Sequence, residues 1–382
     1  MRGKGLVLGV MLGVTLACAP PALAYPGSPT SSIVSLGDSY ISGEAGRWQG
    51  NTSNNLGDRN GTDRAAVCST PLTCTYDAGR VYLYGTDANN CHRSDTAEIL
   101  SANIPVGLKV NLACSGAQTA NVFYSSEGGQ AFKGEAPQGD QLGFIARATN
   151  VKMIVLSIGG NDLGFATLVQ ECVTAYLTMA GPCEDEQRRA INRVFVPVMG
   201  RIDRAIKSIR GVMAANGYRN VPYKLVVQSY PSVLQRSAEN RYPEGDPLRA
   251  AEGGCPFYDS DSDWARDDAV RQISRGIRAV ALANNAQFLD LQDAFQGREF
   301  CSTSSATVGI GQTPDGSVHE WGRYVNQGSL TQGELQESFH PNSFGQRALG
   351  KCVELIWAQT GPEYDCVNTP GQGPSGMQLG GA

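Results

Sequence analysis

The sequence contains a serine, a histidine and potential oxyanion donors in short segments that could together hydrolyse an ester. Ser39 follows a short apolar run, a position from which a strand can present a side chain at the carboxyl edge of a sheet. Gly116 and Asn161 also follow apolar runs, and His340 lies near the C-terminus. Ester hydrolysis needs a nucleophile, a base that takes its proton and preorganised donors for the oxyanion.

These residues predict one catalytic unit. Ser39 would be the nucleophile and His340 the general base and acid, while the backbone N–H groups of Ser39 and Gly116 and the Asn161 side-chain amide would bind the oxyanion. Taken one at a time, each residue also fits a turn, a loop or a helix cap. The order of the four segments favours the catalytic interpretation.

That order resembles the four signature blocks of the SGNH hydrolases, also called GDSL lipases and esterases, of the secreted actinobacterial type. The blocks are Gly-Asp-Ser-Tyr at 37–40, Asn-Leu-Ala-Cys-Ser-Gly-Ala at 111–117, Gly-Gly-Asn-Asp at 159–162 and Glu-Ser-Phe-His-Pro-Asn at 337–342. The resemblance covers about residues 33–355. It implies an α/β fold with a three-layer α/β/α, flavodoxin-like parallel sheet, and hydrolysis of carboxylic esters through an acyl-serine, without cofactor or metal.

The acid that orients His340 is the point where the sequence departs from the family pattern. Glu337 stands three residues before His340, where the family usually has Asp, and we expect its carboxylate to accept the imidazole N–H. In some family members a backbone carbonyl orients the His instead. Beside Glu337, a carbonyl from the 302–327 loop would be a second acceptor. Tyr40 also departs from the Leu of Gly-Asp-Ser-Leu, which leaves the nucleophile intact.

Two other functions fit the same residues. An acyltransferase of this fold, including one that matures a natural product, would use the same nucleophile with an alcohol in place of water. A non-catalytic carbohydrate- or lipid-binding module would keep the fold without the chemistry. The four blocks favour hydrolysis of a small-molecule or lipid ester over the binding module.

The first 24 residues have the pattern of a secretory signal peptide. Arg2 and Lys4 precede an apolar stretch at 6–16, and Ala-Leu-Ala at 22–24 fits a cleavage site. Cys18 would permit a lipoprotein, although the residues before it depart from the usual order. We therefore expect a secreted, extracellular protein.

Composition limits the partners of the mature chain. Cleavage after residue 24 would leave 29 basic and 36 acidic residues and a net charge of −7. This acidic balance argues against nucleic acid and against electrostatic docking to anionic membranes. No segment after the signal is apolar enough to span a bilayer, and we expect a monomer.

Ten of the eleven cysteines would remain after cleavage, an even number that suits an oxidising compartment. The absence of any Cys-x-x-Cys spacing argues against a metal site. Pairing of sequence neighbours predicts the bridges 68–74, 91–114, 172–183, 255–301 and 352–366. The resemblance supports Cys91–Cys114, which would brace the loop that carries Gly116.

Apolar runs alternate with helical patterns, which predicts βα units around a parallel sheet. The expected strands are 33–36, 108–112, 153–158, 223–228 and 287–291. An apolar stripe predicts a helix over 187–215 that Pro197 kinks or starts, and Asp263 and Asn342 are predicted to cap later helices. The aspartates of 259–263 resemble the start of a calcium loop, but the residues that should follow are missing.

We expect one hydrolase domain over 25–366 and a disordered Gly- and Pro-rich tail over 367–382. Two long loops, 46–63 and 302–327, flank the Ser39 and His340 segments and are the predicted walls of the acyl pocket.

Overall fold

A seven-stranded sheet forms the centre of the computed structural model, which describes residues 30–325 and 332–381. Its strands, in spatial order, are β4 (Leu108–Asn111), β1 (Ser31–Gly37), β5 (Asn150–Ser157), β6 (Lys224–Gln228), β7 (Gln287–Asp290), β8 (Glu363–Asn368) and β9 (Met377–Gly381). All neighbours are parallel except β8 and β9. The five predicted strands are confirmed, and their order is that of a flavodoxin-like sheet.

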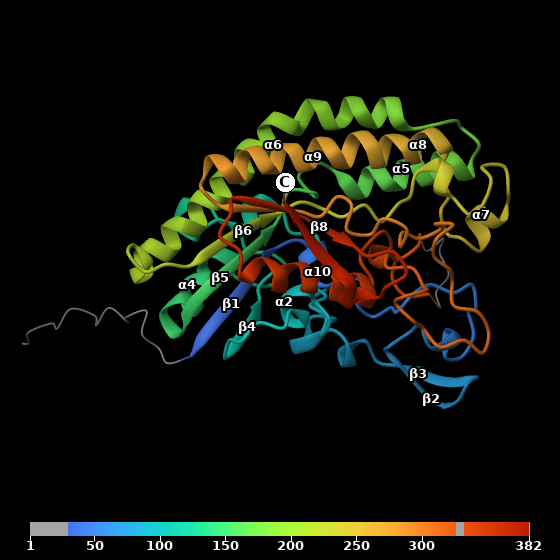
Figure 1. Cartoon of the computed structure of the whole chain (residues 1–382), viewed down its shortest axis with the longest axis horizontal. Helices are drawn as coiled ribbons and strands as arrows, with labels where there is room; N and C mark the ends of the chain where they lie inside the picture. Colours follow the sequence, from blue (N-terminus) through green and yellow to red (C-terminus); the bar gives the residue numbers. More distant parts are fainter. Residues whose placement is uncertain (1–29, 326–331, 382) are drawn as a thin grey trace, which may run out of the picture.

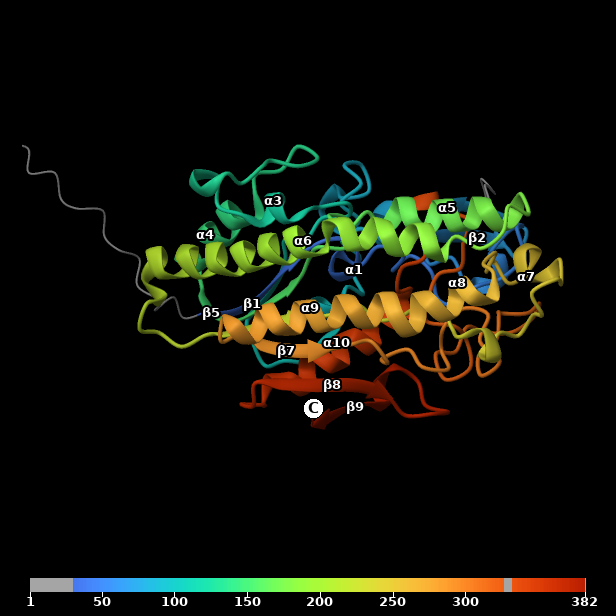
Figure 2. The same ribbon diagram turned by 90° about the horizontal axis from the view of Figure 1, so that it is seen from above.

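Helices cover both faces of this sheet, as predicted (Figure 1). On one face lie α4 (Gln138–Ala148), α6 (Glu184–Met213) and α9 (Val270–Ala283), and Figure 2 shows α6 and α9 running side by side across it. On the other face lie α2 (Glu98–Ser101) and α10 (Ser343–Trp357). Because both faces are covered, the central strands are continuously apolar, and the side chains of β5 from Met153 to Leu156 are fully buried.

Three of the predicted helices form with small differences. The 187–215 helix is α6, and its apolar stripe is buried at Ile191, Val198, Ile202 and Ile209. Pro197 lies inside α6 and does not start it. The cap of α10 is confirmed, since the Asn342 side chain accepts the N–H groups of the next turn.

The helix expected to start at Asp263 starts earlier. The short helix α8 (Asp259–Asp263) continues through a π-helical turn, Trp264–Ala269, into α9. Asp263 does not cap this helix, because its carboxylate accepts the backbone N–H and hydroxyl of Ser237. Residues 259–263 are therefore helical, and the calcium-loop alternative is wrong.

The C-terminal tail was expected to be disordered, and this prediction is wrong. Strand β9 pairs with β8 from Asn368 to Tyr364, and the Met377 side chain is buried. Pairing with a sheet edge supplies partners for the backbone, so a Gly-rich segment can be ordered without a large apolar side chain of its own. The predicted signal segment, residues 1–24, lies outside the described residues.

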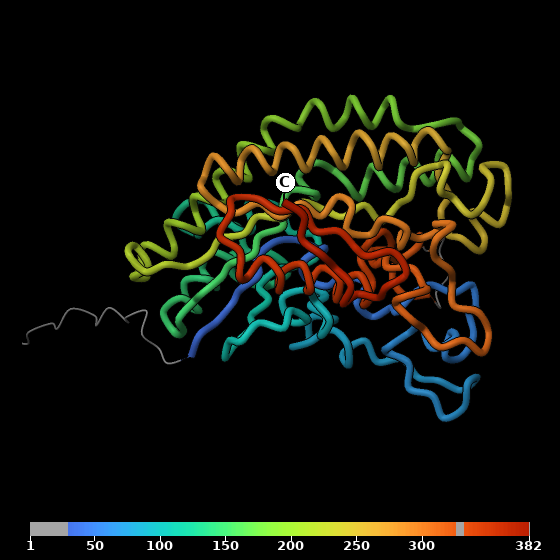
Figure 3. Tube along the Cα trace, viewed as in Figure 1, coloured from blue at the N-terminus to red at the C-terminus, as the bar shows by residue number. Residues whose placement is uncertain are grey.

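All five predicted disulfides are confirmed: Cys68–Cys74, Cys91–Cys114, Cys172–Cys183, Cys255–Cys301 and Cys352–Cys366. The first cross-links a hairpin of β2 (Ala66–Thr70) and β3 (Thr73–Tyr76), and this hairpin projects from the body of the protein (Figure 3). Cys91–Cys114 is instead buried in the core. Within residues 30–325 and 332–381, no helix has the length and apolarity needed to cross a bilayer.

These two bridges should differ in their effect on stability. Replacing Cys91 and Cys114 by Ser should lower the free energy of unfolding by about 3 kcal/mol or more, because the bridge closes a longer loop and is packed in the core. Replacing Cys68 and Cys74 by Ser should lower the free energy of unfolding by about 2 kcal/mol or less. Denaturant unfolding of both double variants measures this, and a larger loss for the hairpin bridge would contradict it.

Candidate active site

Ser39 lies at the carboxyl end of β1, in the first turn of the short helix α1 (Ser39–Ser42). Asp38 caps this helix by accepting the N–H of Tyr40, and its own N–H donates to the Ser157 carbonyl at the end of β5. Gly37 is required before it, because a Cβ there would lie 1.8 Å from the Ser157 oxygen. The close pairing of β1 with the parallel strand β5 at this point sets the position of Ser39.

His340 is brought to Ser39 from the far end of the chain. Its Nε2 lies 2.7 Å from Ser39 Oγ, and its Nδ1 lies 2.8 Å from the Ser338 carbonyl oxygen. The carbonyl can only accept, so Nδ1 carries the proton and Nε2 is free to accept the Ser39 hydroxyl. The two side chains therefore form a Ser–His pair oriented by a backbone carbonyl.

Glu337 does not contact His340, so the prediction that its carboxylate orients the imidazole is wrong. The Glu337 carboxylate accepts hydrogen bonds from the Trp48 indole N–H at 2.9 Å and from the Tyr82 hydroxyl. The backbone turns between 337 and 340 so that the carbonyl, not the acid, faces the ring. The acceptor is instead a backbone carbonyl, as in some family members. It comes from Ser338 and not from the 302–327 loop, where a second acceptor was predicted.

Gly116 and Asn161 line the same cavity as Ser39 and His340. Gly116 has a φ of 85°, a left-handed conformation that glycine adopts without strain. The Asn161 amide donates to the Ala117 carbonyl at 2.9 Å, which joins the two oxyanion segments to each other. The structure thus brings all of the predicted site residues except Glu337 to the same cavity.

Tyr230, which was not predicted, connects the nucleophile segment to the Asn161 segment. Its hydroxyl donates to the buried Asp38 carboxylate at 2.5 Å and accepts the Gly160 N–H at 3.0 Å. Tyr230 follows β6 by two residues, and a tyrosine after a strand gives no sequence signal for such a bridge. The contact depends on the order of strands in the sheet.

Burial shifts the pKa values of His340 and Asp38, two ionisable groups that line the cavity beside Ser39. It lowers the pKa of His340 below the ordinary value of 6.5. It raises the pKa of Asp38 to about 7, although the hydrogen bond from Tyr230 opposes this change. The low pKa of His340 keeps the imidazole neutral, which is the form that can accept a proton.

The cavity beside Ser39 has a volume of about 570 Å³ and is mostly apolar. Its walls come from α5 (Phe165–Leu177), the segment after β6, the helix that runs from α8 into α9, and the segment before His340. Representative lining side chains are Leu168, Val173, Val233, Phe257, Trp264 and Ile273. This cavity has room for an extended apolar chain.

The predicted wall loops are not the observed walls. Among the described residues of 46–63 and 302–327, only Val325 lines the cavity. The two loops bind each other instead, for example through Asn51, whose amide donates to Glu320 and to the Gly322 carbonyl. The polar side chains of these loops, which suggested a functional role, form hydrogen bonds between the two loops.

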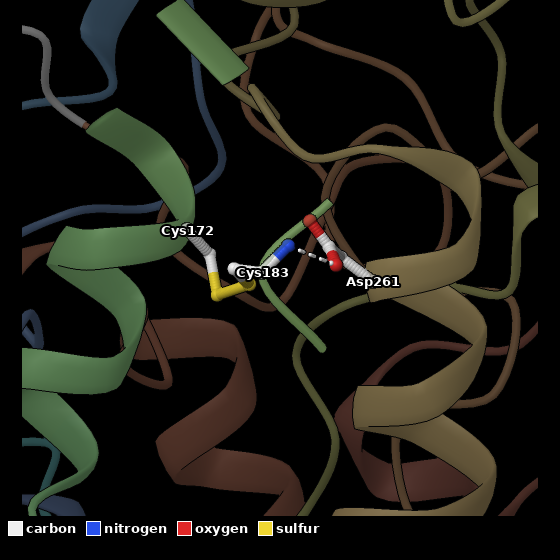
Figure 4. A group of neighbouring side chains, drawn as sticks. All are labelled: Cys172, Cys183 and Asp261. Atoms are coloured by element: carbon white, nitrogen blue, oxygen red, sulfur yellow. Dashed lines mark hydrogen bonds between the residues drawn. A yellow bond between two sulfur atoms is a disulfide. The ribbon is translucent and has the colours of Figure 1, made fainter. Parts of the chain in front are cut away.

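One group at the edge of the cavity combines two sulfurs and a carboxylate (Figure 4). The sulfurs of Cys172 and Cys183 are bonded to each other, so neither is a thiolate ligand. Asp261 accepts the N–H groups of Cys183 and Glu184 at 2.8 and 2.9 Å, where α6 begins. The group therefore joins α5, α6 and α8, and it offers a metal only one carboxylate.

Comparison with known proteins decides the family. The model of the GDSL-like Lipase/Acylhydrolase family matches residues 81–348. The protein belongs to this family. The match includes Gly116, Asn161 and His340 and begins after Ser39. By family the chain is an ester hydrolase, as predicted.

Solved structures of similar fold are also hydrolases. The chain is 20% identical to an extracellular lipase from Streptomyces rimosus, with 86% of this chain and 100% of the lipase covered and a TM-score of 0.51. It is 22% identical to phospholipase A1 from Streptomyces albidoflavus NA297, with 85% and 98% covered and the same TM-score. At this identity the likeness shows the fold. A search of curated protein sequences finds no match.

The pKa of His340 predicts the acid side of the hydrolase's pH profile. If neutral His340 is the base, kcat/KM should fall only below pH 6.5, because burial lowers the pKa of this imidazole. Initial rates on a soluble, uncharged ester between about pH 4 and 9 measure the profile, since such an ester does not titrate there. A midpoint above pH 6.5 would contradict the prediction.

Proposed function

We propose that this protein is an exported serine esterase or lipase that cleaves carboxylic esters through an acyl-Ser39 intermediate. The observation that carries the proposal is the Ser39–His340 contact of 2.7 Å at a cavity that also contains Gly116 and Asn161. Because the family match begins after Ser39, the assignment of the nucleophile depends on this geometry and on the sequence around Ser39.

In the first half of the reaction, Ser39 Oγ attacks the ester carbonyl carbon while His340 Nε2 takes the hydroxyl proton. The carbonyl oxygen becomes an oxyanion, which the Ser39 N–H, the Gly116 N–H and the Asn161 amide would stabilise. The imidazolium then gives its proton to the leaving alkoxide as the C–O bond breaks. The alcohol departs and the acyl group stays on Ser39.

Water completes the cycle by the same route. His340 Nε2 takes a proton from a water molecule while the water oxygen attacks the acyl carbon. The same three donors would stabilise the second oxyanion. When it collapses, the proton returns to Ser39 Oγ and the carboxylic acid is released. This chain's own groups perform each proton transfer, and Ser338 keeps Nδ1 protonated throughout.

The apolar cavity supports a lipid ester as the substrate. Leu168, Phe257 and Ile273 line it and are almost fully buried, so an acyl chain placed against them would be largely removed from water. Burial contributes about 0.8 kcal/mol for each CH₂ group, which favours long chains over acetyl esters. The lipase and the phospholipase A1 of similar fold are consistent with this class.

Export is supported by the signal-like residues 1–24 and by the five disulfides, which persist in oxidising compartments. We also propose that the mature protein is released as a monomer and that its hydrolase domain begins near residue 25.

Ser39→Ala and His340→Ala should each abolish nearly all ester hydrolysis while the fold is retained. The double variant should be about as slow as either single variant, because the two side chains act as one unit. Steady-state rates test this, with circular dichroism to establish folding and a serine-directed phosphonate to count reactive sites. A double variant much slower than both singles, or full phosphonate labelling of Ser39→Ala, would contradict the assignment.

Filling the cavity should change the preferred chain length. Ala265 lines the cavity, and Ala265→Phe should lower kcat/KM for a C16 ester at least about tenfold while a C2 ester changes less than about threefold, since only the long chain loses buried CH₂ groups. Ala283→Phe, at an exposed position of α9, is the matched control. Equal losses for both esters would show that the acyl chain does not enter this cavity.

A further inference from the structure

Glu337 is a buried acid next to the site, and the mechanism above gives it no step. The residue is 1% exposed. Its carboxylate accepts hydrogen bonds from Trp48, from Tyr82 and from the backbone N–H of Glu334. Three donors fix this carboxylate, so Glu337 is firmly anchored although it does not touch His340.

The anchor lies one residue from the carbonyl that orients His340. Ser338 provides this carbonyl, and Phe339 follows it with a φ of +64°, a conformation that a bulky residue keeps only when the surroundings hold it. Beyond the carbonyl, the Phe339 N–H donates to the Arg323 carbonyl and the Phe339 carbonyl accepts from the Tyr40 hydroxyl. The Ser338 carbonyl is therefore held from both sides, and Glu337 provides the N-terminal side.

The donors to Glu337 are themselves held rigidly. The Tyr82 ring stacks on the His92 ring with centroids 4.2 Å apart, and His92 pairs with Glu44 at 2.7 Å. Trp48 is fully buried, and the Arg323 guanidinium lies 3.7 Å from its ring centroid. Neither donor can follow a displaced Glu337 without disrupting these contacts.

We propose that Glu337 is a positioning residue whose anchored carboxylate holds the Ser338 carbonyl in line with the Nδ1–H of His340. The inference rests on the proposed roles of Ser39 and His340. Without the anchor, the peptide between Ser338 and Phe339, which carries the Ser338 carbonyl, can rotate and relieve the strained φ of Phe339. His340 then loses its acceptor, and Nε2 no longer stays aimed at Ser39.

This role has a signature in the pH profile. The bond to Ser338 favours the protonated imidazole and so raises the pKa of His340 against the lowering by burial. The charged groups that act on the pKa of His340 are Glu44, which raises it, and His92, which lowers it. The backbone of Gln336 also raises this pKa. Loss of the Ser338 bond should therefore lower kcat. It should also move the acid limb of the pH profile, the range in which activity falls because His340 becomes protonated, to lower pH.

The test compares Glu337→Gln and Glu337→Ala with Glu299→Gln, which changes another fully buried glutamate that does not line the cavity. On a soluble ester, Glu337→Ala should lower kcat on the order of 10–10³-fold, less than the ~10⁴ known for loss of a triad acid. Glu337→Gln keeps one acceptor oxygen and should lower kcat less. KM should change little, and both acid limbs should move to lower pH, while Glu299→Gln should leave the limb in place.

Two results would overturn the proposal. One is a kcat and an acid limb that both match the parent in Glu337→Ala. The other is a loss of kcat with an unmoved limb, as expected for a purely structural defect. If the Glu337 variants do not fold, Tyr82→Phe removes one donor and should move the limb in the same direction to a smaller extent; an unmoved limb there would also overturn the proposal.

Titration of the parent protein with a phosphonate separates this inference from the proposed function. Absence of labelling at Ser39 would refute the proposed function itself. Stoichiometric labelling together with an unmoved acid limb would refute only the role of Glu337.

Discussion

The hydrogen bond from His340 Nδ1–H to the Ser338 carbonyl is the contact on which the site depends. It fixes the imidazole tautomer and so determines that Nε2 faces Ser39 at 2.7 Å. A neutral carbonyl stabilises an imidazolium less than a carboxylate would, and burial lowers the pKa of His340 further. In the proposed mechanism, the negative charge on the substrate oxygen is stabilised separately, by the proposed oxyanion donors at Ser39, Gly116 and Asn161.

The sheet brings these donors together. Ser39 follows β1 and Asn161 follows β5, two adjacent strands, while Gly116 follows β4 on the other side of β1. The chain thus places its site at the carboxyl edge where the strand order reverses, as doubly wound sheets do. Tyr230, from the end of β6, then joins the Ser39 and Asn161 segments through its single hydroxyl.

Features with a local signal could be predicted from the sequence. The five central strands have apolar runs bounded by turns, Asn342 is followed by a helical pattern, and sequence neighbours among the cysteines proved to be partners. The site residues that follow strands could be predicted to lie close together, because the strand order of this fold places those strands side by side.

Features that depend on distant contacts could not be predicted. Spacing suggested that Glu337 reaches His340, but Trp48 and Tyr82, some 250–290 positions away, bind its carboxylate. The order of the tail depends on pairing with β8, and the cavity walls depend on how α5 packs against the helix that starts at Asp259. A backbone carbonyl such as that of Ser338 has no residue type by which sequence could identify it.

The most direct measurement is a crystal structure of the protein after reaction with a long-chain alkylphosphonate ester. The phosphorus should be bonded to Ser39 Oγ, with the phosphonyl oxygen within hydrogen-bond distance of the Gly116 N–H and the Asn161 amide. The alkyl chain should lie between α5 and α9, and His340 Nδ1 should keep its bond to Ser338. An adduct on another residue, or a chain bound outside this cavity, would contradict the account of the site.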